Sequence, residues 1–130
     1  MMQGTVKWFN TQRGYGFIVD SEGKEHFVYH SNIVMDGFQH LNEDDIVNFE
    51  LGTGKGDREQ AINVRPFLTH KMIRDSLKEE NLHVKTIKDA YKVTKYLVVD
   101  ANNVIQTDEQ GMDFLNLAAF VGFDTEGLSA

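Results

Sequence analysis

The chain has 130 residues, 41% of them hydrophobic and 25% charged, with a net charge of −7 and no cysteine. This composition is typical of one ordinary globular domain or two very small ones, and it excludes disulfides, zinc–thiolate sites and cysteine nucleophiles. No apolar run approaches the ~20 residues that a membrane helix needs. Residues 1–10 also lack the layout of a signal peptide, so we expect a cytoplasmic protein.

Up to about Phe67 the sequence is typical of short strands separated by turns. Five runs are rich in β-branched and aromatic residues: TVKWFN, YGFIVD, HFVYH, IVNFEL and QAINVRP. The turns TQRG and SEGKE connect the first three, and Gly23 can supply the positive φ that the second turn requires. Residues 1–67 are therefore predicted to form a small all-β domain, a closed five-stranded barrel.

Aromatic residues recur at alternate positions of the second and third predicted strands. Alternate side chains of a strand point to the same face, and the opposite faces carry compact residues such as Ile18 and Val28. Compact residues suit a narrow barrel interior, which four large rings would overfill. We therefore expect the first three strands to carry their rings outside: Trp8, Phe9, Tyr15, Phe17, Phe27 and Tyr29.

Basic residues accompany these rings. Lys7, Arg13 and Lys24 lie beside them in the sequence, and Lys55 and Arg58 lie in the loop GTGKGDRE. Unpaired bases stack on aromatic rings at about 1–3 kcal/mol each, while cations meet the phosphates. Residues 1–67 hold six Lys and Arg against ten Asp and Glu, a net charge of −4. The pattern therefore predicts binding of single-stranded nucleic acid, with stacking supplying much of the affinity.

Four motifs carry a family resemblance. GTVKWFN is similar to an opening motif, RGYGFI to a first ribonucleoprotein motif, HFVYH stands at the place of a second, and Asn63-Val64 is similar to the end of a last strand. By these motifs residues 2–64 closely resemble the cold-shock domain family. The resemblance implies an OB-type barrel that binds single-stranded RNA and DNA, and a role as RNA chaperone or transcript regulator. The binding surface that it implies comprises Lys7, Trp8, Phe9, Arg13, Tyr15, Phe17, Phe27, Tyr29, His30 and Phe38.

The chain departs from the family pattern at several positions. Tyr29 stands where the family usually has histidine, and His30 stands where it usually has phenylalanine. Both are flat rings that can stack, so we expect binding with a changed base preference. His26 occupies a core-facing position that is commonly apolar, and we expect it to be a partly exposed residue at a strand end. The loop GTGKGDREQ differs from the usual RGPQA pattern and is more acidic.

The sequence shows no catalytic or metal-binding constellation, and we expect neither an enzyme nor a bound cofactor. GTGKGD lacks the spacing of a phosphate-binding loop, and the five histidines show no HxxxH or HExxH spacing. The run VVDANN ends a predicted strand in Asp100, which we interpret as a hairpin turn in which Asp100 and Asn102 take part in local hydrogen bonds.

Residues 68–130 predict a small α+β domain of no recognised family. HKMIRDSLKEENL predicts a helix after the possible N-cap Thr69, with one apolar stripe: Met72, Ile73, Leu77 and Leu82. VKTIKDAYKVTK can be helical or extended, and a helix would align Lys85, Lys88, Lys92 and Lys95. KYLVVDANNVIQT predicts a hairpin with its turn at Asn102-Asn103. DEQGMDFLNLAAFVGF predicts a helix with these residues inward: Met112, Leu115, Ala119 and Phe120.

The role of this second domain stays open at the level of sequence. It could be a protein-interaction or dimerisation module, which would make the barrel part of an adaptor. It could also be an auxiliary nucleic-acid contact or an autoinhibitory cover over the aromatic face. The expected partners are therefore single-stranded RNA or DNA, with a protein partner or self-association through residues 68–130.

Overall fold

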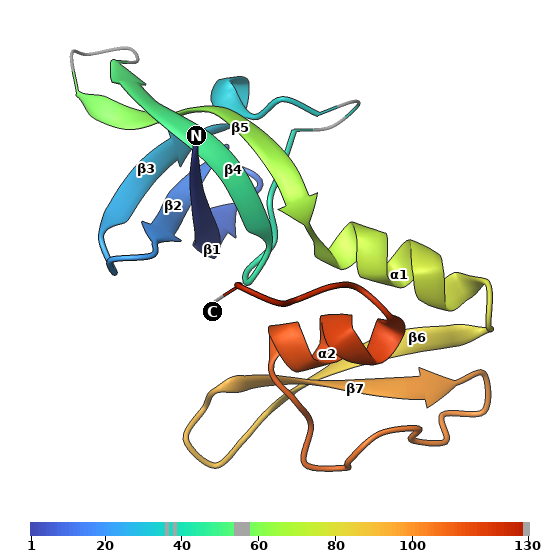
Figure 1. The fold of residues 1–130 in the computed structure, drawn as a ribbon. Helices are drawn as coiled ribbons and strands as arrows, with labels where there is room; N and C mark the ends of the chain where they lie inside the picture. The colour runs from blue at the N-terminus through green and yellow to red at the C-terminus, as the bar shows by residue number, and fades with distance from the viewer. Residues whose placement is uncertain (36, 38, 54–57, 129–130) are drawn as a thin grey trace. The chain divides into compact units, whose positions relative to one another are not determined.

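The computed structural model describes residues 1–35, 37, 39–53 and 58–128, drawn in Figure 1. The chain divides into two compact units, Met1–His70 and Lys71–Ala130. The sequence placed this division between residues 67 and 68. No helix in the described part of the chain is long and apolar enough to cross a membrane.

The first unit is a closed barrel of five strands. They are β1 (Met2–Asn10), β2 (Tyr15–Asp20), β3 (Glu25–Tyr29), β4 (Ile46–Thr53) and β5 (Glu59–Leu68). The order around the barrel is β1-β2-β3-β5-β4. Neighbouring strands are antiparallel except β3 and β5, which pair in parallel at Val28 and Ala61. The predicted five-stranded OB-type barrel is confirmed.

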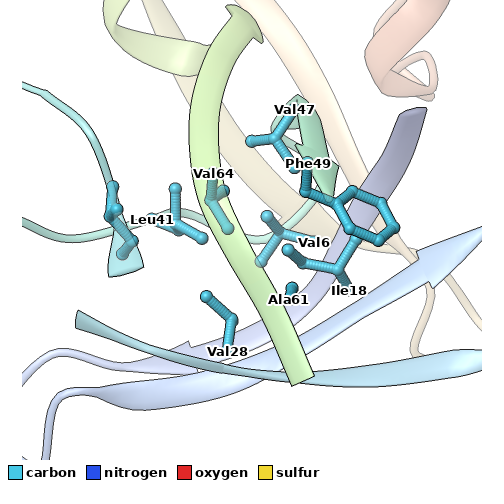
Figure 2. Close-up of a cluster of buried hydrophobic side chains, with 9 residues drawn as sticks. Val6, Ile18, Val28, Leu41, Val47, Phe49, Ala61 and Val64 are labelled. Atoms are coloured by element: carbon cyan, nitrogen blue, oxygen red, sulfur yellow. The ribbon is translucent and has the colours of Figure 1, made fainter. Parts of the chain in front are cut away.

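The barrel interior is filled by compact aliphatic side chains and one ring. Ile18, Val28 and Val47 are fully buried, and Phe49 of β4 supplies the ring. Figure 2 shows these side chains converging on one cluster from different strands. The cluster comprises Val6, Ile18, Val28, Ile33, Leu41, Val47, Phe49, Ala61 and Val64. Because the compact residues Ile18 of β2 and Val28 of β3 fill the interior, the faces of β2 and β3 that carry rings point outward.

The second unit combines a two-stranded sheet with helices, and the predicted small α+β domain is confirmed. Its elements are α1 (His70–Lys78), which begins at the last residue of the first unit, β6 (Leu82–Lys88), β7 (Thr94–Asp100) and α2 (Phe114–Val121). Strands β6 and β7 are antiparallel (Figure 1). The ring centroids of Tyr96 on β7 and Phe114 on α2 lie 6.2 Å apart.

The segment that the sequence left ambiguous is a strand followed by a turn, so its lysines form no helical stripe. Lys85 pairs with Leu97 and Ile87 pairs with Lys95, so Lys85 and Lys95 share one face of the hairpin. Lys88 lies on the opposite face, because successive side chains of a strand alternate. Lysines therefore lie on both sides of the hairpin.

Two details of the predicted helices are wrong. The first helix ends at Lys78 and Leu82 begins β6, so Leu82 is not part of the helical stripe, although Ile73 and Leu77 are buried as predicted. The last helix begins only after Asp113, whose carboxylate accepts the N–H of Asn116 as an N-cap. This start sets the buried face to Phe114, Leu117 and Ala118 and not to the predicted Met112, Leu115, Ala119 and Phe120.

Candidate nucleic-acid interface

A row of rings crosses the outer face of β1, β2 and β3. The strand register pairs Trp8 with Phe17 and Phe17 with Phe27, so these three residues lie side by side on neighbouring strands. The same register pairs Tyr15 with Tyr29. Directly paired residues point to the same face of a sheet, so one face of three strands carries aromatic side chains at adjacent positions.

Four of these rings contact one another and form the cluster that we call the aromatic platform: Trp8, Tyr15, Phe17 and Phe27. The Trp8 centroid lies 5.6 Å from Tyr15 and 5.4 Å from Phe17, edge to face. Phe27 lies 5.7 Å from Phe17 and, nearly parallel, 5.7 Å from Tyr15. These are favourable aromatic geometries, and they hold each ring in place with part of its surface open. The Trp8 side chain keeps 38% of its surface exposed.

A β-bulge at Lys7 puts Trp8 on the platform. Val6 pairs with Ile18 inside the barrel, and the next pair is Trp8 with Phe17, so Lys7 is an extra residue in β1. In an uninterrupted strand Val6 and Trp8 would point to the same face. The bulge reverses the alternation and turns Trp8 outward while Val6 stays buried. The sequence predicted Trp8 outside but not the device that places it there.

Phe9 does not lie with the other rings, and its predicted outward position is wrong. It pairs with Gly16, is half-buried and packs against the hydrophobic core. A Cβ atom on Gly16 would overlap the carbonyl oxygen of Trp8 and the Cα of Phe9. Gly16 therefore lets β1 approach β2 closely at the centre of the platform.

Tyr29 and His30 extend the platform at the end of β3. Their ring centroids lie 4.7 Å apart, and the Tyr29 side chain is 38% exposed. The N–H of His30 donates to the carbonyl of Gly14 at 2.7 Å, and the His30 ring lies against the open side of Gly14, whose φ is +76°. The two positions that depart from the family pattern are thus adjacent rings fixed to the turn before β2.

The basic residues predicted to meet phosphates that the structure describes lie on the exposed surface around these strands. Arg13 is exposed, and its backbone N–H donates to Asn10 in the turn between β1 and β2. Lys7 is exposed too, with its Nζ 3.2 Å from the carboxylate of Glu25 across β2. An exposed ion pair of this kind is weak, so a phosphate can compete for Lys7. Lys24 and Arg58 are exposed; Phe38 and Lys55 lie outside the described residues.

His26 is not the partly exposed residue that we expected. It is 5% exposed, its Nε2 lies 2.8 Å from Oδ2 of Asp20, and its ring centroid lies 5.4 Å from that of Phe49. The hydrogen bond from His26, followed by those from the backbone N–H groups of Lys24 and Glu22, holds the pKa of Asp20 below its usual value. A buried polar side chain is tolerated here because Asp20 satisfies it. The pair joins β3 to the last residue of β2, where the turn between these two strands begins.

The arrangement offers groups that suit bases and phosphates. Among the described residues, no group of three or more His, Cys, Asp or Glu side chains is placed to hold a metal ion. The outer face of β1–β3 supplies open ring surfaces, with amine and guanidinium groups near its margins. Such a surface suits a flexible strand whose bases are free to turn toward the protein.

Comparison with known proteins agrees with this geometry. The family model described as 'Cold-shock' DNA-binding domain matches residues 2–67, half of the chain. The chain belongs to the cold-shock domain family. Cold shock-like protein CspA of Stigmatella aurantiaca is 52% identical over 66 residues, which cover 50% of this chain and 96% of that protein. Cold shock protein 1 of Lactiplantibacillus plantarum is 48% identical over 67 residues, 51% of this chain and 98% of that protein.

A third cold-shock relative is the cold shock-like protein of Thermotoga maritima, 50% identical over 54 residues that cover 42% of this chain and 82% of that protein. The cold-shock family match ends at residue 67, within the last strand of the barrel. The aromatic platform therefore lies wholly inside the matched part, and the second unit lies outside it.

Proposed function

We propose that the barrel binds single-stranded RNA or DNA on the aromatic platform and acts as an RNA chaperone or transcript regulator without catalysing a reaction. The observation that carries this proposal is the set of ring contacts that joins Trp8, Phe17 and Phe27 across three strands on the outside of the barrel. Membership of the cold-shock domain family supports it.

The mechanism follows from what the platform can and cannot contact. Unpaired bases stack on the exposed parts of the rings, at about 1–3 kcal/mol for each base, and stacking works with any base. Phosphates of the same strand meet Lys7 and Arg13. A strand held in this way cannot pair with a complement, so binding opens unwanted secondary structure. Bases in a duplex are already stacked and give the rings nothing to hold.

Electrostatics contribute little to the strength of this binding. The barrel region has a net charge of −4, so long-range attraction for a polyanion is absent and only nearby cations help. We therefore expect few phosphate contacts and a shallow dependence of affinity on salt, with a slope of about −0.7 for each phosphate neutralised on a single strand. A shallow slope distinguishes a stacking surface from a basic groove.

The test is a titration of the full chain with an oligothymidylate or oligouridylate of about seven nucleotides, within the usual site size of an OB-type barrel. Trp8 is the only tryptophan, so its fluorescence reports on the platform directly. We expect the single strand to quench Trp8 and a duplex of the same length to leave it unchanged. Equal binding of the duplex, or binding without a change in Trp8 emission, would contradict the proposal.

A further inference from the structure

Three hairpin turns of this chain share one hydrogen-bonding pattern, each begun by an aspartate: Asp20, Asp89 and Asp100. In each, the carboxylate accepts the N–H groups two and four residues later. The aspartate also exchanges backbone hydrogen bonds within the turn, accepting from the residue three positions later and donating to the carbonyl four positions later. Because the same backbone is built three times, differences among the turns in side chains do not come from the needs of the turn.

The residue three positions after each aspartate has a positive φ. It is Gly23 at +81°, Asn103 at +62° and Lys92 at +63°. Glycine and asparagine tolerate this left-handed conformation, and lysine does so less readily. The turn between β6 and β7 thus holds a lysine where the chain elsewhere uses the residues that suit the geometry. Strain that persists at one site is a reason to ask what the side chain does there.

The side chain before Lys92 is equally unusual. Tyr91 is 87% exposed, the largest exposed fraction among the large hydrophobic side chains that the structure describes. The corresponding residues of the other two turns are Glu22 and Asn102, both polar. The N–H of Tyr91 is fixed by Asp89 at 2.8 Å, so an ordered turn presents this ring to solvent. Tyrosine is enriched at contact surfaces, where its ring can pack while its hydroxyl stays hydrated.

Positive charge gathers at the same hairpin. Residues 82–95 hold four lysines and one aspartate, a net charge of +3 in a chain whose net charge is −7. Lys88 ends β6, where its Nζ contacts the hydroxyl of Thr94 at 2.7 Å, and Lys95 is the second residue of β7. Hydrogen bonds from the N–H groups of Val93 and Tyr91 and the charge of Lys95 hold the pKa of Asp89 below its usual value. The carboxylate is therefore committed to the turn. Among the described residues, Lys88, Lys92 and Lys95 form no direct ion pair with a carboxylate.

We propose that this hairpin tip is a second contact site for single-stranded nucleic acid, in which Tyr91 stacks on a base and Lys88, Lys92 and Lys95 meet phosphates. An exposed ring with lysines on both faces of the same hairpin offers both groups that a single strand needs, whereas an acidic protein segment would use the lysines alone. The site lies in the second unit, so it is independent of the barrel proposal and can fail or succeed alone.

The decisive variant is the double substitution Tyr91→Asn and Lys92→Asn. It changes DAYKV at residues 89–93 into DANNV, the sequence of the turn at residues 100–104. The fold of the hairpin is therefore preserved by a sequence that the chain already uses for the same turn. A thermal denaturation of the variant, which should be at least as stable as the parent chain, checks this directly. Phe120→Ala removes a 49% exposed ring elsewhere in the same unit and serves as the matched control.

The measurement follows the backbone amides of residues 88–95 and of β1–β3 by NMR while oligothymidylate of about seven nucleotides is added to the full chain. We expect the hairpin amides to shift in the parent, in Phe120→Ala and in a Phe17→Leu/Phe27→Leu variant with a weakened platform. From the shifts of the hairpin amides, we expect the double asparagine variant to bind oligothymidylate about fivefold more weakly or worse. Tyr91→Phe should bind it as the parent does.

Three outcomes would overturn the proposal. The hairpin amides could fail to shift at an excess of strand, or the double asparagine variant could bind as the parent does. The hairpin amides could also respond to oligoglutamate as strongly as to oligothymidylate, which would identify the hairpin as a contact for acidic protein segments. Loss of the barrel shifts alone would contradict the platform and leave the hairpin site standing, so the two proposals are tested separately.

Discussion

Replacement of Phe17 by leucine separates the stacking role of its ring from its packing role. Phe17 lies at the centre of the aromatic platform, with centroids 5.4 Å from Trp8 and 5.7 Å from Phe27. Leucine keeps most of the buried volume but offers no flat surface. The variant should therefore lose the aromatic part of two ring contacts, about 0.5–1.5 kcal/mol each beyond area burial, and stay folded. Loss of one stacked base should cost a further ~1–3 kcal/mol of binding free energy.

The assay compares unfolding and binding in the same preparations. Urea denaturation gives the free energy of unfolding, and titration with a short oligothymidylate gives the dissociation constant for Phe17→Leu, Phe27→Leu and the double variant. Since the two rings contact each other, their effects on affinity should not add, with a coupling of about 0.5 kcal/mol or more. The matched control is Phe120→Ala, an exposed ring in the second unit, which should leave barrel binding unchanged.

Binding of Phe17→Leu as tight as that of the parent, together with a lower free energy of unfolding, would contradict the stacking role. That result would make the ring a packing residue whose exposed part meets no ligand. Full additivity of the two leucine substitutions would contradict only the claim that the rings act as one surface.

Three further predictions concern backbone and charge. The pKa of Asp20 in the folded protein is below the usual 3.8, so this carboxylate stabilises the fold fully above pH 3.8 and loses its contribution as the pH falls through the pKa of the folded state. His26→Val removes the main cause of the lowered pKa. The free energy of unfolding of this variant, measured against pH, should therefore decline less steeply in acid. Gly16→Ala should destabilise by about 1–3 kcal/mol in urea denaturation because its Cβ meets backbone, whereas Gly52→Ala meets the flexible end of an isoleucine and should cost less than about 1 kcal/mol. Lys92→Gly should stabilise by about 0.5–1 kcal/mol by relieving the left-handed lysine, and an unchanged unfolding midpoint would contradict this.

Most of the barrel could be predicted from strand alternation, because a narrow closed barrel imposes strong rules on size. Ile18 and Val28 fit inside, and the combined volume of the rings on the opposite faces does not, so these rings could be predicted outside. Strand alternation alone does not reveal a β-bulge. Alternation through β1 cannot place Val6 inside and Trp8 outside together, and only the pairing of β1 with β2 reveals that Lys7 is an extra residue.

His26 shows a different limit of sequence reasoning. A histidine at a core-facing position of a strand end is usually solvated, since burying an unsatisfied imidazole is costly. The cost disappears when a partner is buried with it. Asp20 supplies that partner from the preceding strand, six residues away, and at the same time accepts two N–H groups of the turn. Neither residue alone indicates the pair, because the contact depends on the length of the turn that joins their strands.

The second unit was harder to predict because its lysines match more than one period. VKTIKDAYKVTK has lysines three and four residues apart, which suits a helix, yet the segment is a strand and a turn. The sequence does contain the spacing that marks a turn, but a lysine stands at its key position. An aspartate followed three residues later by Gly23 or Asn103 marks the other two turns, and the same spacing runs from Asp89 to Lys92. Lysine at that position hides the turn, since it is a residue that favours helices and avoids positive φ. The feature that made the fold of this segment hard to predict is thus the feature that singles it out: a turn built for glycine or asparagine presents a lysine beside an exposed tyrosine.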